Sequence, residues 1–190
     1  MDVALDATGL AVRKYTPRWL TTDYALRGRD FIKLHAAIEL DSQAFLSWEL
    51  TYSNTHEVTL GPTLLEKITG KIGRVFADAG YLSNKMCLAV HARGATPFIH
   101  PKKTSKGRER KEAYMPSQRA HEAYITMMDS YQNDEAAWLA TYHKRSGIES
   151  CFGGFKQRLR GSLRAMKERT MAMELVLRLI VWNVTRMTRL

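Results

Sequence analysis

The chain has 190 residues, of which 29 are Lys or Arg and 19 are Asp or Glu, so its formal net charge is +10. This length suits one domain with a substantial core, and the excess of positive charge indicates a polyanionic partner, first of all a nucleic acid. The longest apolar stretch, residues 175–184, is too short to span a membrane and contains Arg178. Composition therefore argues against a membrane protein, and we expect a cytoplasmic one.

The first half of the chain predicts a small antiparallel sheet followed by a helix. Short β-like runs at 3–5, 33–40 and 45–52 are separated by turn signals, and we expect three consecutive strands. Pro62 stands where the first turn of a helix tolerates proline, and the apolar face that follows it ends at Gly70. This order predicts a helix directly after the third strand.

The middle of the chain predicts parallel strands. Residues 75–77 form a short apolar strand that leads into Asp78, and Ser83 or Asn84 can cap a helix that ends near Ala92. Another strand is predicted at 96–99. A strand, helix, strand order favours parallel pairing within one sheet.

A basic segment and three helices follow. Residues 102–111 hold six basic residues and one acid, which predicts a basic loop in which Lys102 and Lys103 are candidate DNA contacts. Such a charge run is more often a solvated face. Apolar periodicity predicts helices at 117–131, 134–160 and 171–187, the last of them packed on the sheet.

Four polar residues with the spacing Y-x2-R-x3-E-x6-K lie in the second of these helices. Tyr142, Arg145, Glu149 and Lys156 fall within about 60° of one another at about 100° per residue, and apolar residues occupy the neighbouring strip. The stripe is therefore anchored beside the core. The pair Gly153-Gly154 weakens the helix by about 1 kcal/mol per residue and can kink it before Lys156.

This spacing resembles the C-terminal catalytic signature of the DDE transposases of bacterial and archaeal insertion sequences. Two further blocks resemble that family and stand in its order. The first is VALDATGL, residues 3–10, where Ala7 replaces the usual hydroxyl residue, and the second is RVFADAGY, residues 74–81. In the family each of these blocks places an aspartate at the end of a strand, here Asp6 and Asp78.

The resemblance implies the fold and the extent of the domain. It predicts an α/β fold of the ribonuclease H-like type, the retroviral integrase superfamily, with a mixed five-stranded sheet flanked by helices. One catalytic domain would cover 1–190, with a basic loop at about 101–112 and a C-terminal helical part at about 116–190. Relatives carry an N-terminal DNA-binding region, yet Asp6 comes five residues after Met1, so we expect a truncated, frame-split or decayed copy.

The resemblance makes Asp6, Asp78 and Glu149 the catalytic residues and the metal ligands. Phosphodiester cleavage by in-line attack is helped by two divalent ions, and hard ions such as Mg²⁺ or Mn²⁺ prefer carboxylate oxygen. Each acid by itself has a simpler explanation: the aspartates as strand-to-turn residues, and Glu149 as the helical partner of Arg145. The three together, in order, favour the catalytic interpretation.

The remaining positions of the signature would bind DNA. By resemblance, Arg145 and Lys156 hold phosphates, the first as a bidentate fork and the second as a point charge. Tyr142 contacts the DNA backbone or stacks nearby, and a core aromatic is an equal alternative. We read Thr8 and Gly9 as a tight strand exit that admits a phosphate.

Other reactive or aromatic residues receive no catalytic role. The six histidines form no H-x-x-x-H pair, and Cys87 and Cys151 form no C-x-x-C pair, so we expect reduced thiols and no zinc site. Tyr81 would support Asp78. The four tryptophans lie within apolar patterns and are expected in the core: Trp19, Trp48, Trp138 and Trp182.

The function implied by the resemblance is DNA transposition. The protein would hydrolyse a phosphodiester at the terminal inverted repeats and join the freed 3′-hydroxyl to target DNA, as a homodimer on DNA and associated with the nucleoid. Three alternatives stay open: an inactive remnant that binds DNA, another ribonuclease H-like nuclease, and a basic RNA-binding module.

Overall fold

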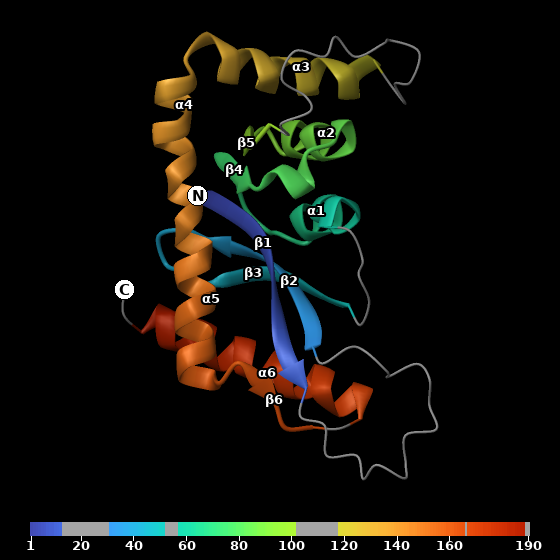
Figure 1. Ribbon diagram of the computed structural model, residues 1–190, viewed down its shortest axis with the longest axis vertical. Helices are drawn as coiled ribbons and strands as arrows, with labels where there is room; N and C mark the ends of the chain where they lie inside the picture. The colour runs from blue at the N-terminus through green and yellow to red at the C-terminus, as the bar shows by residue number, and fades with distance from the viewer. Residues whose placement is uncertain (13–30, 52–56, 102–117, 166, 189–190) are drawn as a thin grey trace.

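The computed structural model describes residues 1–12, 31–51, 57–101, 118–165 and 167–188, and they form one mixed sheet covered by helices on both faces (Figure 1). The strands are β1 (Asp2–Val12), β2 (Phe31–Glu39), β3 (Phe45–Thr51), β4 (Arg74–Ala77), β5 (Thr96–Ile99) and β6 (Ser162–Leu163). The helices are α1 (Glu57–Glu66), α2 (Asn84–Ala92), α3 (Gln118–Asn133), α4 (Glu135–Tyr142), α5 (Ser146–Leu159) and α6 (Glu168–Met187). Two single 3₁₀ turns, η2 (Ala79–Tyr81) and η5 (His143–Arg145), join them.

The sheet has the order β3-β2-β1-β4-β5, which matches the predicted three antiparallel strands followed by parallel ones. The fold prediction is thus confirmed. A short sixth strand that the sequence did not predict, β6, pairs in parallel with the end of β1. β1 is also longer than expected, because β2 pairs with it as far as Ala11. The prediction that Thr8 and Gly9 form a strand exit is therefore wrong: both lie inside β1.

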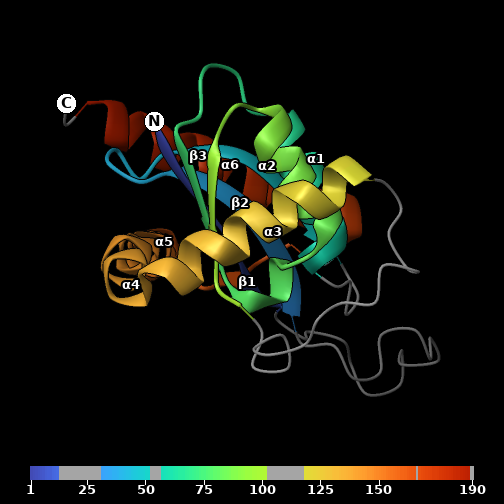
Figure 2. The ribbon, with the colours of Figure 1, turned by 90° about the horizontal axis from the view of Figure 1, so that it is seen from above.

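Side chains of β1 alternate between two apolar cores, one on each face of the sheet. Val3 and Leu5 are fully buried against α1, α2, α3 and α4, whereas Ala4 and Leu10 are fully buried against α5 and α6. Figures 1 and 2 show these two helical layers on either side of the strands. Because successive side chains of a strand point to opposite faces, Asp6 points toward α5.

The predicted helix at 134–160 is divided into α4, η5 and α5, which together form a nearly straight rod (Figures 1 and 2). Asp134 caps its start by accepting a hydrogen bond from the Ala137 N–H at 2.9 Å. α5 continues through both glycines without a break. A Cβ at position 154 would lie 3.0 Å from the Trp182 ring, so Gly154 permits the close approach of α6.

α6 packs on the sheet, as predicted. Trp182 is buried, and its indole N–H donates to the Gln43 carbonyl at 2.8 Å. Asn183 accepts a hydrogen bond from the Phe45 N–H and donates to the Phe45 carbonyl, both at 2.8 Å, which joins α6 to the start of β3. No helix in the described ranges is long and apolar enough to cross a membrane.

Several local predictions can now be compared with the structure. α1 begins at Glu57, so the placement of Pro62 in a first helical turn was wrong. Ser83 is the cap of α2 and accepts from the Met86 N–H at 3.1 Å. Trp138 is buried like Trp182, Trp48 is partly buried against the core, and Trp19 lies outside the described residues. The basic segment with Lys102 and Lys103 also lies outside them.

Candidate active site

Asp6 lies where the paired region of β1 and β4 ends. The last residues in the parallel pairing are Leu5 and Ala77, so Asp6 and Asp78 both come directly after it. Asp78 follows β4 as expected, but the expectation that Asp6 ends its strand is wrong, because β1 continues to Val12 along β2. Oδ1 of Asp6 accepts a hydrogen bond from the Ala7 N–H at 2.8 Å. The parallel register therefore places side by side two acids that are distant in the sequence.

Asp78 is held by the turn that follows it. It is the N-cap of η2, and its Oδ1 accepts a hydrogen bond from the Gly80 N–H at 2.8 Å. Tyr81 ends this turn, is fully buried, and donates its backbone N–H to the Asp78 carbonyl at 3.1 Å. The core thus anchors the turn, which is the support that we expected from Tyr81.

Arg145 forms hydrogen bonds with two of the three predicted catalytic acids, Asp6 and Glu149. Its Nη2 donates to Oδ2 of Asp6 at 3.1 Å, and its Nη1 donates to Oε1 of Glu149 at 2.8 Å. The Arg145 and Asp6 side chains are largely buried, whereas that of Glu149 is 60% exposed. One guanidinium at the end of η5 thus bridges β1 and α5, and its partner on β1 is 139 positions away in the sequence.

The charges around this guanidinium raise its pKa. Burial is the largest single effect and by itself lowers the pKa of Arg145, but the charge of Asp6, the nearby Tyr142 and the hydrogen bond to Glu149 together outweigh it. The Nε of Arg145 is buried and has no hydrogen-bond partner in the described part of the chain. A donor of the site is thus left unpaired.

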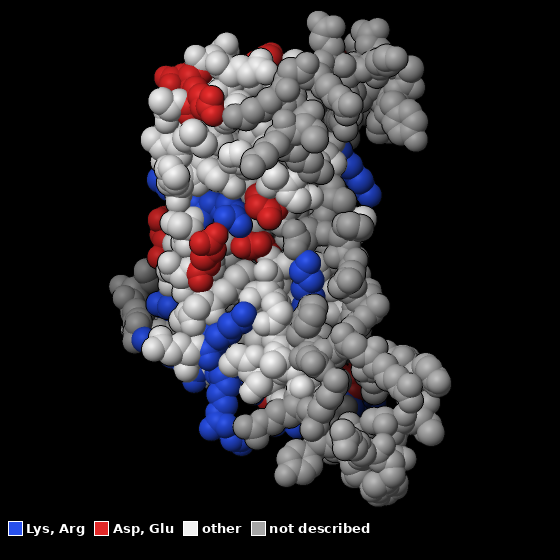
Figure 3. Space-filling model, viewed as in Figure 1, with Lys and Arg blue, Asp and Glu red and all other residues white. Residues whose placement is uncertain are grey.

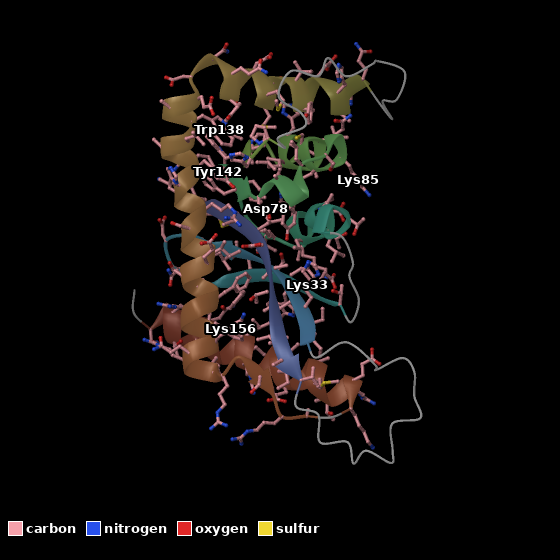
Figure 4. All side chains as sticks on the ribbon, viewed as in Figure 1. Lys33, Asp78, Lys85, Trp138, Tyr142 and Lys156 are labelled. Carbon is pink, nitrogen blue, oxygen red and sulfur yellow. The ribbon has the colours of Figure 1, made fainter. Side chains whose placement is uncertain are left out.

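The negative charges of the three acids all affect the pKa of Tyr142. Burial is the main cause that raises the pKa of its hydroxyl, Arg145 opposes it, and the negative charges of Asp78, Asp6 and Glu149 raise it further. All three acids therefore act on one side chain. Figure 3 shows acidic side chains gathered around cationic ones in the middle of the face that it presents. Figure 4 shows Tyr142 and Asp78 near each other in the same view.

Tyr142 also belongs to a cluster of rings, which supports the core-aromatic interpretation of this residue, and its contact with DNA stays a prediction. It stacks on Trp138, with centroids 5.1 Å apart, and lies 5.4 Å from His100. His100 directly follows β5, and its backbone N–H donates to the Ala77 carbonyl at 3.3 Å. The cluster supports the rod beside the acids, and Tyr142 is half-buried within it.

His100 lies beside Tyr142 at the candidate site and received no role in the sequence analysis. Its Nδ1 lies 2.9 Å from the Pro101 carbonyl, an acceptor, so Nδ1 carries the proton and Nε2 is left as the other polar atom of the ring. The missed signal is its position after β5. Ligand-binding residues gather beyond the carboxyl ends of parallel strands, and Asp78 and His100 are the residues that directly follow β4 and β5.

Lys156 extends the site along the rod. It lies two turns beyond Glu149 on α5 and is half-buried, with its aliphatic stem next to Gly161. Figure 4 shows it further along the rod than Tyr142 and Asp78. The expected stripe is therefore present, but Lys156 lies at a distance from the acids.

The donor set of the site fits hard divalent cations. Carboxylate oxygens are the ligands that Mg²⁺ and Mn²⁺ prefer, and three carboxylates act on Tyr142. Within the described ranges, however, no three His, Cys, Asp or Glu side chains form a group that could hold a metal ion. Arg145 lies between Asp6 and Glu149 instead. The metal-binding role of the acids stays a prediction.

A mixed sheet with helices on both faces, and aspartates that come directly after the parallel pairing of two adjacent strands, is the arrangement of ribonuclease H-like phosphoryl-transfer domains. The sequence model of the family described as transposase DDE domain matches residues 2–184. The chain belongs to this family, which acts on nucleic acids in transposition. No curated protein matches the chain at a significant level.

Proposed function

We propose that this protein carries out DNA transposition by metal-dependent hydrolysis of phosphodiesters at transposon ends and transfer of the freed 3′-hydroxyl into target DNA. The single observation that supports this most is the Arg145 bridge between Asp6 and Glu149. Arg145 of the helical signature contacts the first acid across 139 positions of sequence and links it to Glu149 through the same guanidinium. Membership of the family supplies the reaction class.

Asp6, Asp78 and Glu149 are the proposed catalytic acids. When bound, two Mg²⁺ or Mn²⁺ ions would stabilise the attacking and leaving oxygens. Asp6 and Asp78 come from adjacent strands whose hydrogen bonding makes them rigid, and backbone N–H groups orient both carboxylates. Glu149 is the exposed member and approaches from the rod. Rigid acids on strands and an exposed one on a helix suit a site that must admit DNA.

Arg145 has two proposed roles. In the protein alone it holds Asp6 and Glu149 together by donating a hydrogen bond to each carboxylate. With DNA bound, its planar fork suits a phosphate, and its unpaired Nε is a further donor. Tyr142 would contact the backbone beside it, and Lys156 would hold a phosphate further along the rod. Two subunits would act together on paired ends.

A DNA-binding remnant without catalysis is the second candidate function. It is favoured by the arrangement itself, because the protein's own arginine pairs with two of the three acids. This candidate and the first make the same prediction for DNA binding. They differ only in metal-dependent chemistry.

The test is nicking and strand transfer on labelled DNA at low salt, with Mg²⁺, Mn²⁺ or EDTA, by the protein and by Glu149→Gln. We expect metal-dependent products that fall by at least about a hundredfold in the variant, since a metal ion contributes several kcal/mol to the transition state. Binding without product under any metal would favour the remnant. Equal products from both proteins would show that Glu149 has no catalytic role.

A further inference from the structure

A second cationic surface lies at the far end of the rod, beyond Lys156, the last residue of the signature. From Lys156 to Arg169, both included, the chain holds six basic residues and a single acid, Glu168. Four basic side chains from the end of α5 to the start of α6 are exposed, and we call them the basic turn: Arg158, Arg160, Arg164 and Lys167. None of the four forms an ion pair with a carboxylate in the part of the chain that the structure describes.

The backbone of the basic turn is fixed by α6. Glu174 accepts hydrogen bonds from the Arg164 and Ala165 N–H groups at 2.9 and 2.8 Å, and it pairs with Arg178. Arg178 in turn donates to the Arg160 carbonyl at 3.0 Å. The cations are therefore carried by an ordered scaffold, which reduces the entropy lost when they bind a ligand.

β1 and α5 connect the basic turn with the acids. Gly161 accepts a hydrogen bond from the Ala11 N–H at 2.9 Å, and β6 pairs with the last residues of β1, the strand that carries Asp6. From Asp6 to Ala11 the strand advances about 17 Å. Along α5, Glu149 to Arg160 spans about 16 Å. Two independent elements thus give the same separation.

This separation corresponds to a short length of duplex DNA. B-DNA advances about 3.4 Å per base pair, so about 16 Å is close to five base pairs. Figure 3 shows a run of Lys and Arg side chains below the acids, on the same face of the molecule and over the lower part of the rod. Lys156 lies between the two sites (Figure 4). A straight duplex can therefore reach both.

We propose that the basic turn binds phosphates of duplex DNA about five base pairs from the phosphodiester held at the acids, so that the rod aligns the duplex with the site. This inference rests on the proposed function for the position of the reacting phosphate. The ligand is the sugar-phosphate backbone, so the basic turn contributes affinity and orientation and leaves sequence readout to other contacts.

The first test measures binding of a labelled duplex by fluorescence anisotropy in EDTA, so that cleavage plays no part. The triple variant Arg158→Gln, Arg160→Gln, Arg164→Gln is compared with a control that loses the same charge on other exposed residues: Lys71→Gln, Lys85→Gln, Arg119→Gln. For the Arg158, Arg160, Arg164 triple alone, we expect binding to be weaker by about tenfold or more at about 50 mM salt. The slope of the logarithm of the binding constant against the logarithm of the salt concentration should also become flatter by about 2 to 3. Equal weakening in both triples would overturn the proposal.

A second test asks whether position 160 lies next to bound DNA, and its result does not depend on a change in affinity. Both native cysteines are buried, so a photo-crosslinker attached to Arg160→Cys labels one exposed thiol. We expect this protein to crosslink to duplex DNA, whereas the same reagent on Lys85→Cys, on α2 across the sheet, does not (Figure 4). No crosslink from position 160 would overturn the proposal. Crosslinking without any metal-dependent nicking would contradict the proposed function and leave this inference standing.

Discussion

Two Arg–Glu pairs with the same helical spacing serve different purposes in this molecule. In α6, Glu174 pairs with Arg178 and also accepts two backbone N–H groups, and its side chain is 21% exposed. At the rod, Glu149 pairs with Arg145 and is 60% exposed. A carboxylate whose acceptor sites are filled by its own protein holds structure, whereas one with free acceptor sites is available to a ligand.

The pKa of Glu174 shows the same contrast. Burial alone would raise it, but the N–H donors of Ala165 and Arg164 and the charge of Arg178 outweigh burial, so the pKa is lowered. Because hydrogen bonds to an ionised group are stronger than those between neutral groups, Glu174 stabilises the turn before α6. The contrast predicts that the two pairs respond differently to mutation and to pH.

The largest effect is expected at Arg145. Arg145→Met removes the cation that Asp6 and Glu149 share, so both carboxylates lose their common hydrogen-bond donor. We expect metal-dependent nicking to fall by at least about a hundredfold. Arg145→Lys, which keeps the charge but loses the fork, should recover only part of the activity. Unchanged nicking in Arg145→Met would show that the bridge has no part in catalysis.

A smaller effect is expected at Glu174. Glu174→Gln weakens charge-assisted hydrogen bonds to two backbone N–H groups, and we expect a loss of about 2 kcal/mol in the free energy of unfolding. For a chain of this size the melting temperature would fall by about 4 to 8 °C. Glu149→Gln is the matched control and should cost less than about 0.5 kcal/mol, since an exposed helical pair is worth little. Equal losses in thermal denaturation would remove the distinction between the two pairs.

The smallest effect concerns pH. The pKa of Glu174 is lower in the folded chain than the value of about 4.3 expected on unfolding, so its contribution to stability is present above that value. It is lost as pH falls through the folded pKa. The difference in unfolding free energy between the protein and Glu174→Gln should therefore stay constant from about pH 7 to 5 and narrow below about pH 4.5. Urea titrations at several pH values measure this, and a difference that widens on acidification would contradict it.

The sequence by itself determined the order of the main strands and the positions of the acids. Apolar runs are local signals, so β2, β4, β5 and α6 were predictable within a few residues. The exact ends of strands were less predictable than their presence. β1 continues past Asp6 because β2 supplies pairing partners from 20 to 28 residues further along the chain, from Ala7↔His35 to Ala11↔Phe31, and no local residue signals that pairing.

Only the tertiary structure decided how the candidate site is connected. That Arg145 serves both Asp6 and Glu149 depends on the packing of the rod against β1, and the place of His100 depends on the β4–β5 register. The basic turn lies in line with the acids because two residues of β6 pair with the end of β1. Residue type and spacing set which groups are available, but contacts between distant segments come from the cooperative packing of the whole core, and that packing sets the distances at which these groups act.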